Sequence, residues 1–126
     1  MRAMLAMKQY QQVNVQAQVS DASPHRLIQM LMEGGLERMA QAQGAMMREQ
    51  GSLKGELISK SIGIIGGLRE ALDPSRGGEV ASNLDRLYEY MIARLIHANK
   101  ANDPAVLTEV AGLLREVKSG WDAIAP

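Results

Sequence analysis

Few side chains in this sequence could carry acid–base, nucleophilic or metal chemistry, and they lie far apart. The two histidines, His25 and His97, fall in different predicted helices, and the 126 residues include no cysteine. The HExxH, GxSxG and P-loop motifs are absent. Gly63, Gly66 and Gly67 lack the following Lys-Ser/Thr of a phosphate-binding loop. The carboxylates form no acid and base pair, so we expect no enzyme, no metal site and no cofactor.

Charge and hydrophobicity narrow the possible partners. Fourteen Lys and Arg balance fourteen Asp and Glu. Nucleic acids and anionic membranes both attract a basic face, so neither is expected as the main partner. The longest apolar run is far short of the ~20 residues that a membrane span requires, and the first residues do not resemble a secretory signal. The absence of cysteine fits a cytoplasmic protein, and no membrane insertion is expected.

The sequence predicts four helices, because polar breaks separate segments whose apolar residues recur at steps of three and four. A capping residue precedes Pro at Ser23-Pro24 and at Asp103-Pro104, which predicts two helix starts. We expect a loop over residues 73–78. The expected helices cover about 24–49, 52–72, 79–100 and 104–123.

Short connections between these segments predict an all-α fold, an antiparallel four-helix bundle. We expect a single domain over residues 1–126, with the bundle at 23–123. Residues 1–22 are rich in Gln, with scattered apolar residues such as Met7, Tyr10 and Val13. This segment is predicted to be a mobile arm or a short extra helix that docks in a groove, or else a frayed terminus.

The first predicted helix is apolar over more than half of its circumference. No helix of a four-helix bundle is central, so one of its faces is expected to meet another chain, the first twenty residues or the chain ends. The sequence has nine Met and no Phe. Methionine suits either a core whose gaps it fills or a face that adapts to varied partners.

Three glycines within the second predicted helix need a physical reason, because each costs about 1 kcal/mol relative to Ala. They are Gly63, Gly66 and Gly67. We expect a neighbouring helix, within the bundle or from a partner, to approach them closely. On the other helices, Tyr88 and Trp121 fall on core stripes, whereas Tyr90 lies off the stripe and is expected to contact a partner.

Three stretches of the sequence form a distinctive combination: Ser23-Pro24-His25-x-Leu27-Ile28, Gly77-Gly78-Glu79 and Leu87-Tyr88-x-Tyr90-Met91. Together they resemble the FliS family of flagellar secretion chaperones. The resemblance runs from about Tyr10 to Trp121, and the combination is specific although each stretch alone is weak. The sequence departs from the family pattern at Arg2, where Tyr is frequent, and at Met32, where Phe or Tyr is usual.

The resemblance implies a cytoplasmic export chaperone that binds the disordered C-terminal segment of flagellin and prevents premature polymerisation. It further implies delivery to the export gate protein FlhA of the flagellar type III apparatus, and a link to the anti-sigma factor FlgM. We expect a monomer that binds its client one to one. The alternative is a generic helical adaptor, or a homodimeric structural protein that uses the apolar face of the first helix. The expected partner-binding residues are Met7, Tyr10, Val13, Ile28, Leu31, Met32, Leu36, Tyr90 and Met91, with Ser23 and Asp103 as structural caps.

Overall fold

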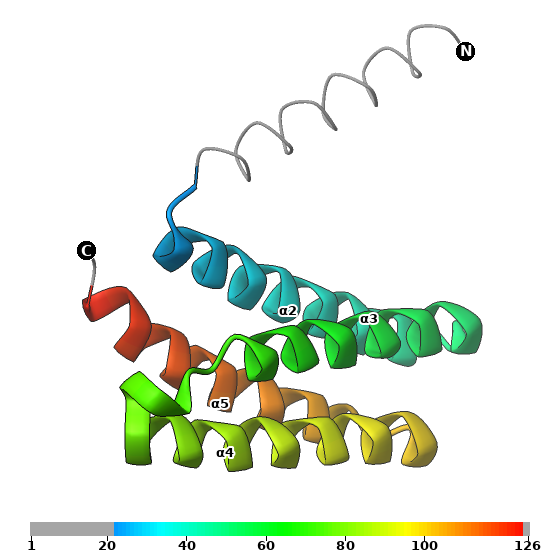
Figure 1. Cartoon of the computed structure of the whole chain (residues 1–126). Helices are drawn as coiled ribbons and strands as arrows, with labels where there is room; N and C mark the ends of the chain where they lie inside the picture. The colour runs from blue at the N-terminus through cyan, green and yellow to red at the C-terminus, as the bar shows by residue number, and fades with distance from the viewer. Residues whose placement is uncertain (1–21, 125–126) are drawn as a thin grey trace, which may run out of the picture.

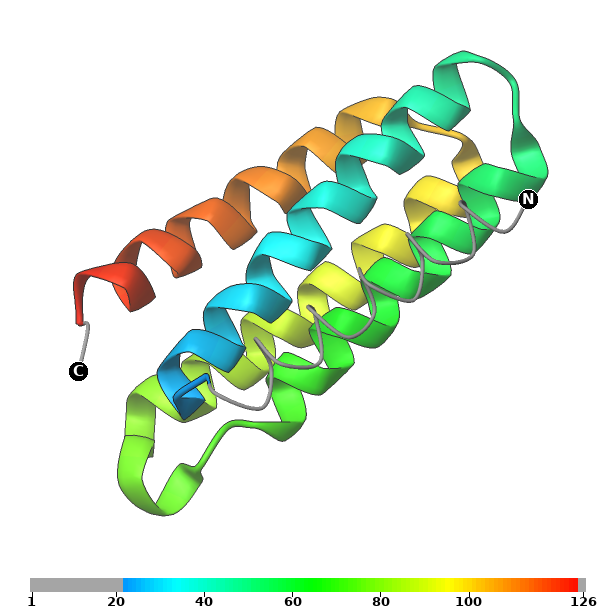
Figure 2. The same cartoon turned by 90° about the horizontal axis from the view of Figure 1, so that it is seen from above.

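Helices dominate the computed structural model, which describes residues 22–124 (Figure 1). They are α2 (Pro24–Met47), α3 (Gly51–Glu70), α4 (Pro74–Ala101) and α5 (Pro104–Ala123). Helix α2 packs against α3 and α5, and α4 packs against the same two helices. The four helices therefore form a ring, with successive helices running antiparallel (Figure 2). The predicted all-α four-helix bundle is confirmed over this part of the chain. The proposed arm lies outside the described residues.

Side-chain caps and prolines define where α2 and α5 begin. The Oγ atom of Ser23 accepts a hydrogen bond from the Arg26 amide at 3.1 Å, and Pro24 follows it as the first helical residue. Asp103 accepts from the Ala105 amide at 3.0 Å in the same way. Each cap satisfies one of the amides that a helix start leaves without an intrahelical partner.

Replacing Asp103 by Ala should lower the free energy of unfolding by about 1 kcal/mol, because the start of α5 loses its acceptor. Urea denaturation followed by circular dichroism measures this change. Asp103→Asn, which keeps an acceptor oxygen, is the matched control and should retain most of the stability. Equal losses in the two variants would contradict the capping role.

The connection before α4 differs from the predicted loop over 73–78. Asp73 accepts a hydrogen bond from the Ser75 amide at 3.0 Å, so helical structure already begins at Pro74. Gly78 interrupts it with φ 51° and ψ −122°. A positive φ favours glycine, so the chain turns there before the main part of α4. The expectation of a loop was therefore wrong for the first turn, because the Asp-Pro cap also suits a short helix.

The core of the bundle is built from aliphatic side chains and methionine. Met32, Met39, Met46 and Met91 are buried, so these methionines fill the core, whereas Met47 is 75% exposed. Helix α2 uses its wide apolar surface on two neighbours at once, α3 and α5. The other large core residues are Leu57, Ile58, Ile65, Leu68, Tyr88, Leu95, Val106, Leu107, Val110 and Leu114.

Close helix packing occurs at a different glycine from those expected. A Cβ atom on Gly35 of α2 would lie 3.2 Å from Leu114 Cδ2 and 3.3 Å from Ile64 Cγ2. By contrast, a Cβ atom on Gly63, Gly66 or Gly67 would meet nothing within 4 Å in the described structure. The prediction that a helix of the bundle packs on those three glycines was therefore wrong.

Polar links join the helices at the end of the bundle that holds the α2–α3 and α4–α5 turns. The Gln43 side chain donates to the Pro104 carbonyl at 3.0 Å and to Thr108 Oγ1 at 2.7 Å. The Lys54 ammonium donates to the Asn99 carbonyl at 3.0 Å and to Asn102 Oδ1 at 3.1 Å. These contacts tie α2 to α5 and α3 to α4, away from the cleft described next.

Candidate functional site

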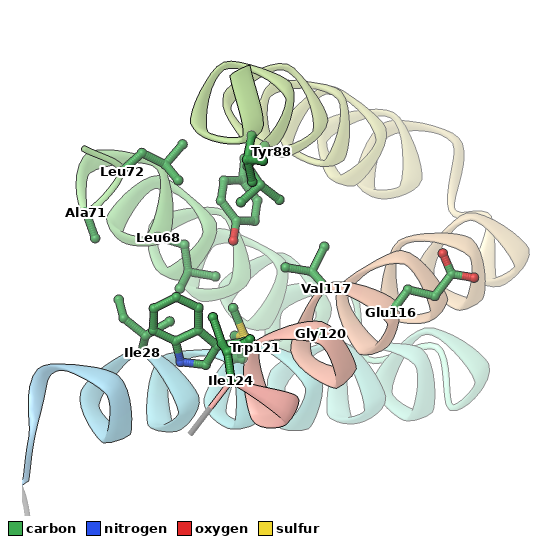
Figure 3. Close-up of a pocket in the computed structure, with 13 residues that line it drawn as sticks. Ile28, Leu68, Ala71, Leu72, Tyr88, Glu116, Val117, Gly120, Trp121 and Ile124 are labelled. Atoms are coloured by element: carbon green, nitrogen blue, oxygen red, sulfur yellow. The ribbon is translucent and has the colours of Figure 1, made fainter. Parts of the chain in front are cut away.

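An apolar cleft of about 370 Å³ opens where the start of α2 meets the ends of α3 and α5 and the first turns of α4 (Figure 3). All four helices supply side chains to it, so it exists only because the bundle brings these distant segments together. Its volume lies in the lower part of the ~300–1,000 Å³ range of ligand sites. The lining residues are Ile28, Met32, Leu68, Ala71, Leu72, Val80, Leu84, Tyr88, Glu116, Val117, Gly120, Trp121 and Ile124.

One wall of the cleft is the indole of Trp121, near the end of α5. The Trp121 Nε1 atom donates to the His25 carbonyl oxygen at 3.0 Å. The indole of Trp121 also stacks on the imidazole of His25, with ring centroids 4.6 Å apart and ring planes 10° from parallel. The His25 Nε2 atom is buried and has no hydrogen-bond partner among the described residues. Trp121 thus fastens the end of α5 to the first turn of α2.

The hydroxyl of Tyr88 projects into the cleft from α4 (Figure 3). The residue is only 2% exposed. Burial raises the pKa of Tyr88 above its usual value, because the phenolate would lose hydration. Tyr88 therefore offers a neutral O–H donor inside an apolar space.

The rim of the cleft is apolar on two sides. Val80 is 67% exposed and Ile124 is 64% exposed, so both present aliphatic surface to solvent. Glu116 is the charged residue in the lining. Apolar surface beside a concave apolar site is a feature of protein interaction sites.

Asp122 stabilises this end of the bundle from outside the cleft. It accepts from Lys118 Nζ at 2.7 Å and from Gln29 Nε2 at 2.8 Å, which links α5 to α2. The hydrogen bond from Lys118 is the main reason that the pKa of Asp122 lies below its usual value. The α2–α5 side of the cleft therefore carries both this link and the Trp121–His25 contact.

The structure brings together only some of the predicted partner-binding residues. Ile28 and Met32 line the cleft, although Met32 is 1% exposed. Leu31 is half-buried against the core. Leu36 lines a separate hollow of about 70 Å³ between α2 and α5. The predicted contacts Met7, Tyr10 and Val13 lie outside the described residues.

The two predicted contacts on α4 lie in different environments. Met91 is fully buried, so in this conformation it packs the core and presents no surface to a partner. Tyr90 is 42% exposed, but its hydroxyl donates to Glu109 at 2.7 Å, and Arg94 Nε donates to the same carboxylate at 2.8 Å. The bonds from Tyr90 and then Arg94 lower the pKa of Glu109. This network joins α4 to α5 outside the cleft.

Sequence reasoning missed most of the cleft. Val80, Leu84 and Ile124 carry no distinguishing local pattern, and Trp121 was expected to close the core. Trp121 does pack against the core, but it also forms a cleft wall. The available signal was the pair of a lone Trp near the end of the last helix and a His beside Ser23-Pro24. Their contact spans 96 positions, which spacing along one helix cannot reveal.

Other kinds of site find no support in the described part of the chain. Between residues 22 and 124, no three His, Asp or Glu side chains gather as a metal ion would require. No helix in that range combines the length and apolar character of a membrane span. A small helical bundle with an open apolar cleft is typical of proteins that bind a segment of another protein.

Comparison with known proteins agrees with this class. The family model described as flagellar protein FliS matches residues 6–126. The flagellar secretion chaperone FliSB of Pseudomonas aeruginosa is 73% identical over 125 residues, 99% of each chain. The FliS chaperone of Salmonella typhimurium is 46% identical over 94% of this chain and 89% of its own length. The FliS chaperone of Vibrio cholerae is 43% identical over 96% of this chain and 89% of its own length. The chain belongs to the FliS family and is a flagellar export chaperone, a class of protein that is not an enzyme class.

Proposed function

We propose that this chaperone binds the disordered C-terminal segment of flagellin and keeps it from polymerising before export. The observation that carries the proposal is the apolar cleft between the four helix ends, in a chain of the FliS family. An unfolded client exposes apolar side chains, and such a cleft removes them from water. Ile28 and Met32 would contact the client from α2.

The proposed mechanism is binding and release without a chemical step. A segment that orders on binding loses conformational entropy, so its affinity is modest for the area it buries. Modest affinity suits a client that must be handed to an export gate. We propose that this occurs in the bacterial cytoplasm, that the gate protein is FlhA, and that FlgM is a further partner.

Calorimetric titration with a peptide of the C-terminal segment of the same organism's flagellin tests the proposal. We expect one-to-one binding with a negative heat-capacity change, and a gain of helix in the circular dichroism of the mixture. A peptide of the same composition in scrambled order is the control. No binding at tens of micromolar, together with a stable homodimer in sedimentation, would overturn the proposal and favour a structural adaptor.

A further inference from the structure

We infer that His25 is a positioning residue for the cleft, because the face of its imidazole holds the indole of Trp121 in place as one wall. This inference rests on the proposed function and adds a residue that lies outside the cleft lining. His25 acts on a client only through Trp121. Its effect on binding therefore depends on how often that wall is in position.

The wall that Trp121 forms is built on the last turn of a helix (Figure 3). Helix α5 ends at Ala123, and Ile124 beyond it is 64% exposed. The last four carbonyl groups of a helix have no intrahelical partner, and chain ends are poorly ordered unless other contacts tie them down. A cleft wall at this place therefore needs a contact with an element that is held more firmly.

The first turn of α2 is such an element, because the Ser23 cap and Pro24 fix its start. His25 follows directly. Its carbonyl oxygen accepts a hydrogen bond from Trp121 Nε1 at 3.0 Å. Its imidazole stacks on the indole, with ring centroids 4.6 Å apart and ring planes 10° from parallel. One residue thus restrains both the N–H edge and the face of the indole.

The ring stack is the contribution that depends on the identity of residue 25. Asp122 also links the two helices, through Gln29 Nε2 at 2.8 Å, but this bond is exposed and water competes for both partners. The bond from Trp121 to the His25 carbonyl is partly buried, yet any residue at this position offers the same carbonyl. Only a flat ring supplies the stack, which stabilises the contact beyond the area that it buries.

The imidazole engages Trp121 through its face and not through a nitrogen. The His25 Nε2 atom is buried and has no hydrogen-bond partner among the described residues. A buried polar atom without a partner costs free energy, so a ring that lacks this nitrogen should fit here at least as well. Phenylalanine is therefore the conservative substitution for the proposed role.

The position of the wall affects how strongly the cleft binds. A site that has the competent shape for only a fraction of the time binds with an affinity reduced by that fraction. Without the stack, the indole follows the fraying end of α5, and a client must order it on binding. His25 therefore contributes to client affinity although it does not touch the client.

Three variants of the full-length chain test this inference with the flagellin peptide. His25→Ala removes the stack but keeps the backbone carbonyl, and peptide affinity should fall roughly two- to tenfold. His25→Phe keeps a flat ring and should restore the affinity of the unmodified chain. The matched control is His97→Ala, because His97 is the other histidine, is exposed and lies outside the cleft lining. It should bind the peptide as the unmodified chain does.

The mobility of Trp121 provides a measurement that needs no client. Trp121 is the only tryptophan in the sequence, so time-resolved fluorescence anisotropy reports on this wall alone. We expect fast local motion of the indole in His25→Ala, but only overall tumbling in the unmodified chain, His25→Phe and His97→Ala. Circular dichroism identifies a temperature at which all four proteins are folded. A histidine that merely stabilised the bundle would leave the indole immobile in folded His25→Ala.

The outcomes separate this inference from the proposed function. If the unmodified chain binds the peptide but His25→Ala retains full affinity or an immobile indole, only the inference fails. If His25→Phe behaves as His25→Ala does, a ring nitrogen acts at this position instead of the ring face, which also overturns the inference. If the unmodified chain does not bind the peptide, the proposed function fails, and the anisotropy measurements still decide whether His25 holds Trp121.

Discussion

Replacing Gly63, Gly66 and Gly67 together by alanine should raise the free energy of unfolding by about 2–3 kcal/mol. Each glycine in a helix interior costs about 0.8–1.0 kcal/mol relative to Ala, largely through the backbone freedom of the unfolded chain. A Cβ atom at these positions meets nothing within 4 Å among the described residues, so no steric penalty offsets the gain. Urea denaturation of the triple variant measures the change.

The control for this prediction is Gly35→Val. A Cβ atom there already lies 3.2 Å from Leu114 and 3.3 Å from Ile64, so larger side chains overpack the contact between α2, α3 and α5. We expect a loss of about 1–3 kcal/mol. A triple variant that is no more stable than the parent would contradict our view that no other described part of the chain crowds this side of α3. If it were more stable but bound the flagellin peptide less tightly, the glycine face would belong to the client interface.

Replacing Met91 by Ala should lower the free energy of unfolding by about 2–5 kcal/mol. Met91 is fully buried in the core, so truncation leaves a cavity as well as removing apolar contact. This is a large fraction of the 5–15 kcal/mol that stabilises a typical domain. Chemical denaturation followed by circular dichroism measures the loss.

The exposed residue Ile96 provides the comparison on the same helix. It is 55% exposed, so Ile96→Ala should change stability by no more than about 0.5 kcal/mol. Under conditions where both variants are folded, each should bind the flagellin peptide with the affinity of the parent. A Met91→Ala protein of undiminished stability that has lost peptide binding would instead support the interpretation of Met91 as a client contact.

The helices could be predicted from the sequence because their signals are local. Ser23-Pro24 and Asp103-Pro104 define two helix starts, and apolar steps of three and four define the buried faces. The start of α4 was harder to predict. Asp73-Pro74 and Gly77-Gly78 lie so close together that the residues between them suit either a turn of helix or a loop. The structure resolves this by placing the positive φ at Gly78.

The cleft could not be predicted, because it depends on how four helix ends lie relative to one another. Tyr88 was correctly assigned to the core, but nothing in its spacing indicates that its hydroxyl faces an open space. The expectation that another helix of the bundle approaches the three glycines of α3 failed for a related reason. Spacing identifies which residues share a face of α3, but not whether another helix covers that face.

The distribution of methionine has a consequence for oxidative damage. In a chain without cysteine, the thioether is the main oxidisable sulfur, and its sulfoxide is polar and chiral. Met47, at 75% exposed, can be converted at little cost to packing, whereas Met39 and Met91 are shielded by the closed bundle. Sulfoxide formation at those two sites requires the helices to separate first. Peroxide would therefore damage the chaperone at a rate set by how often its core opens.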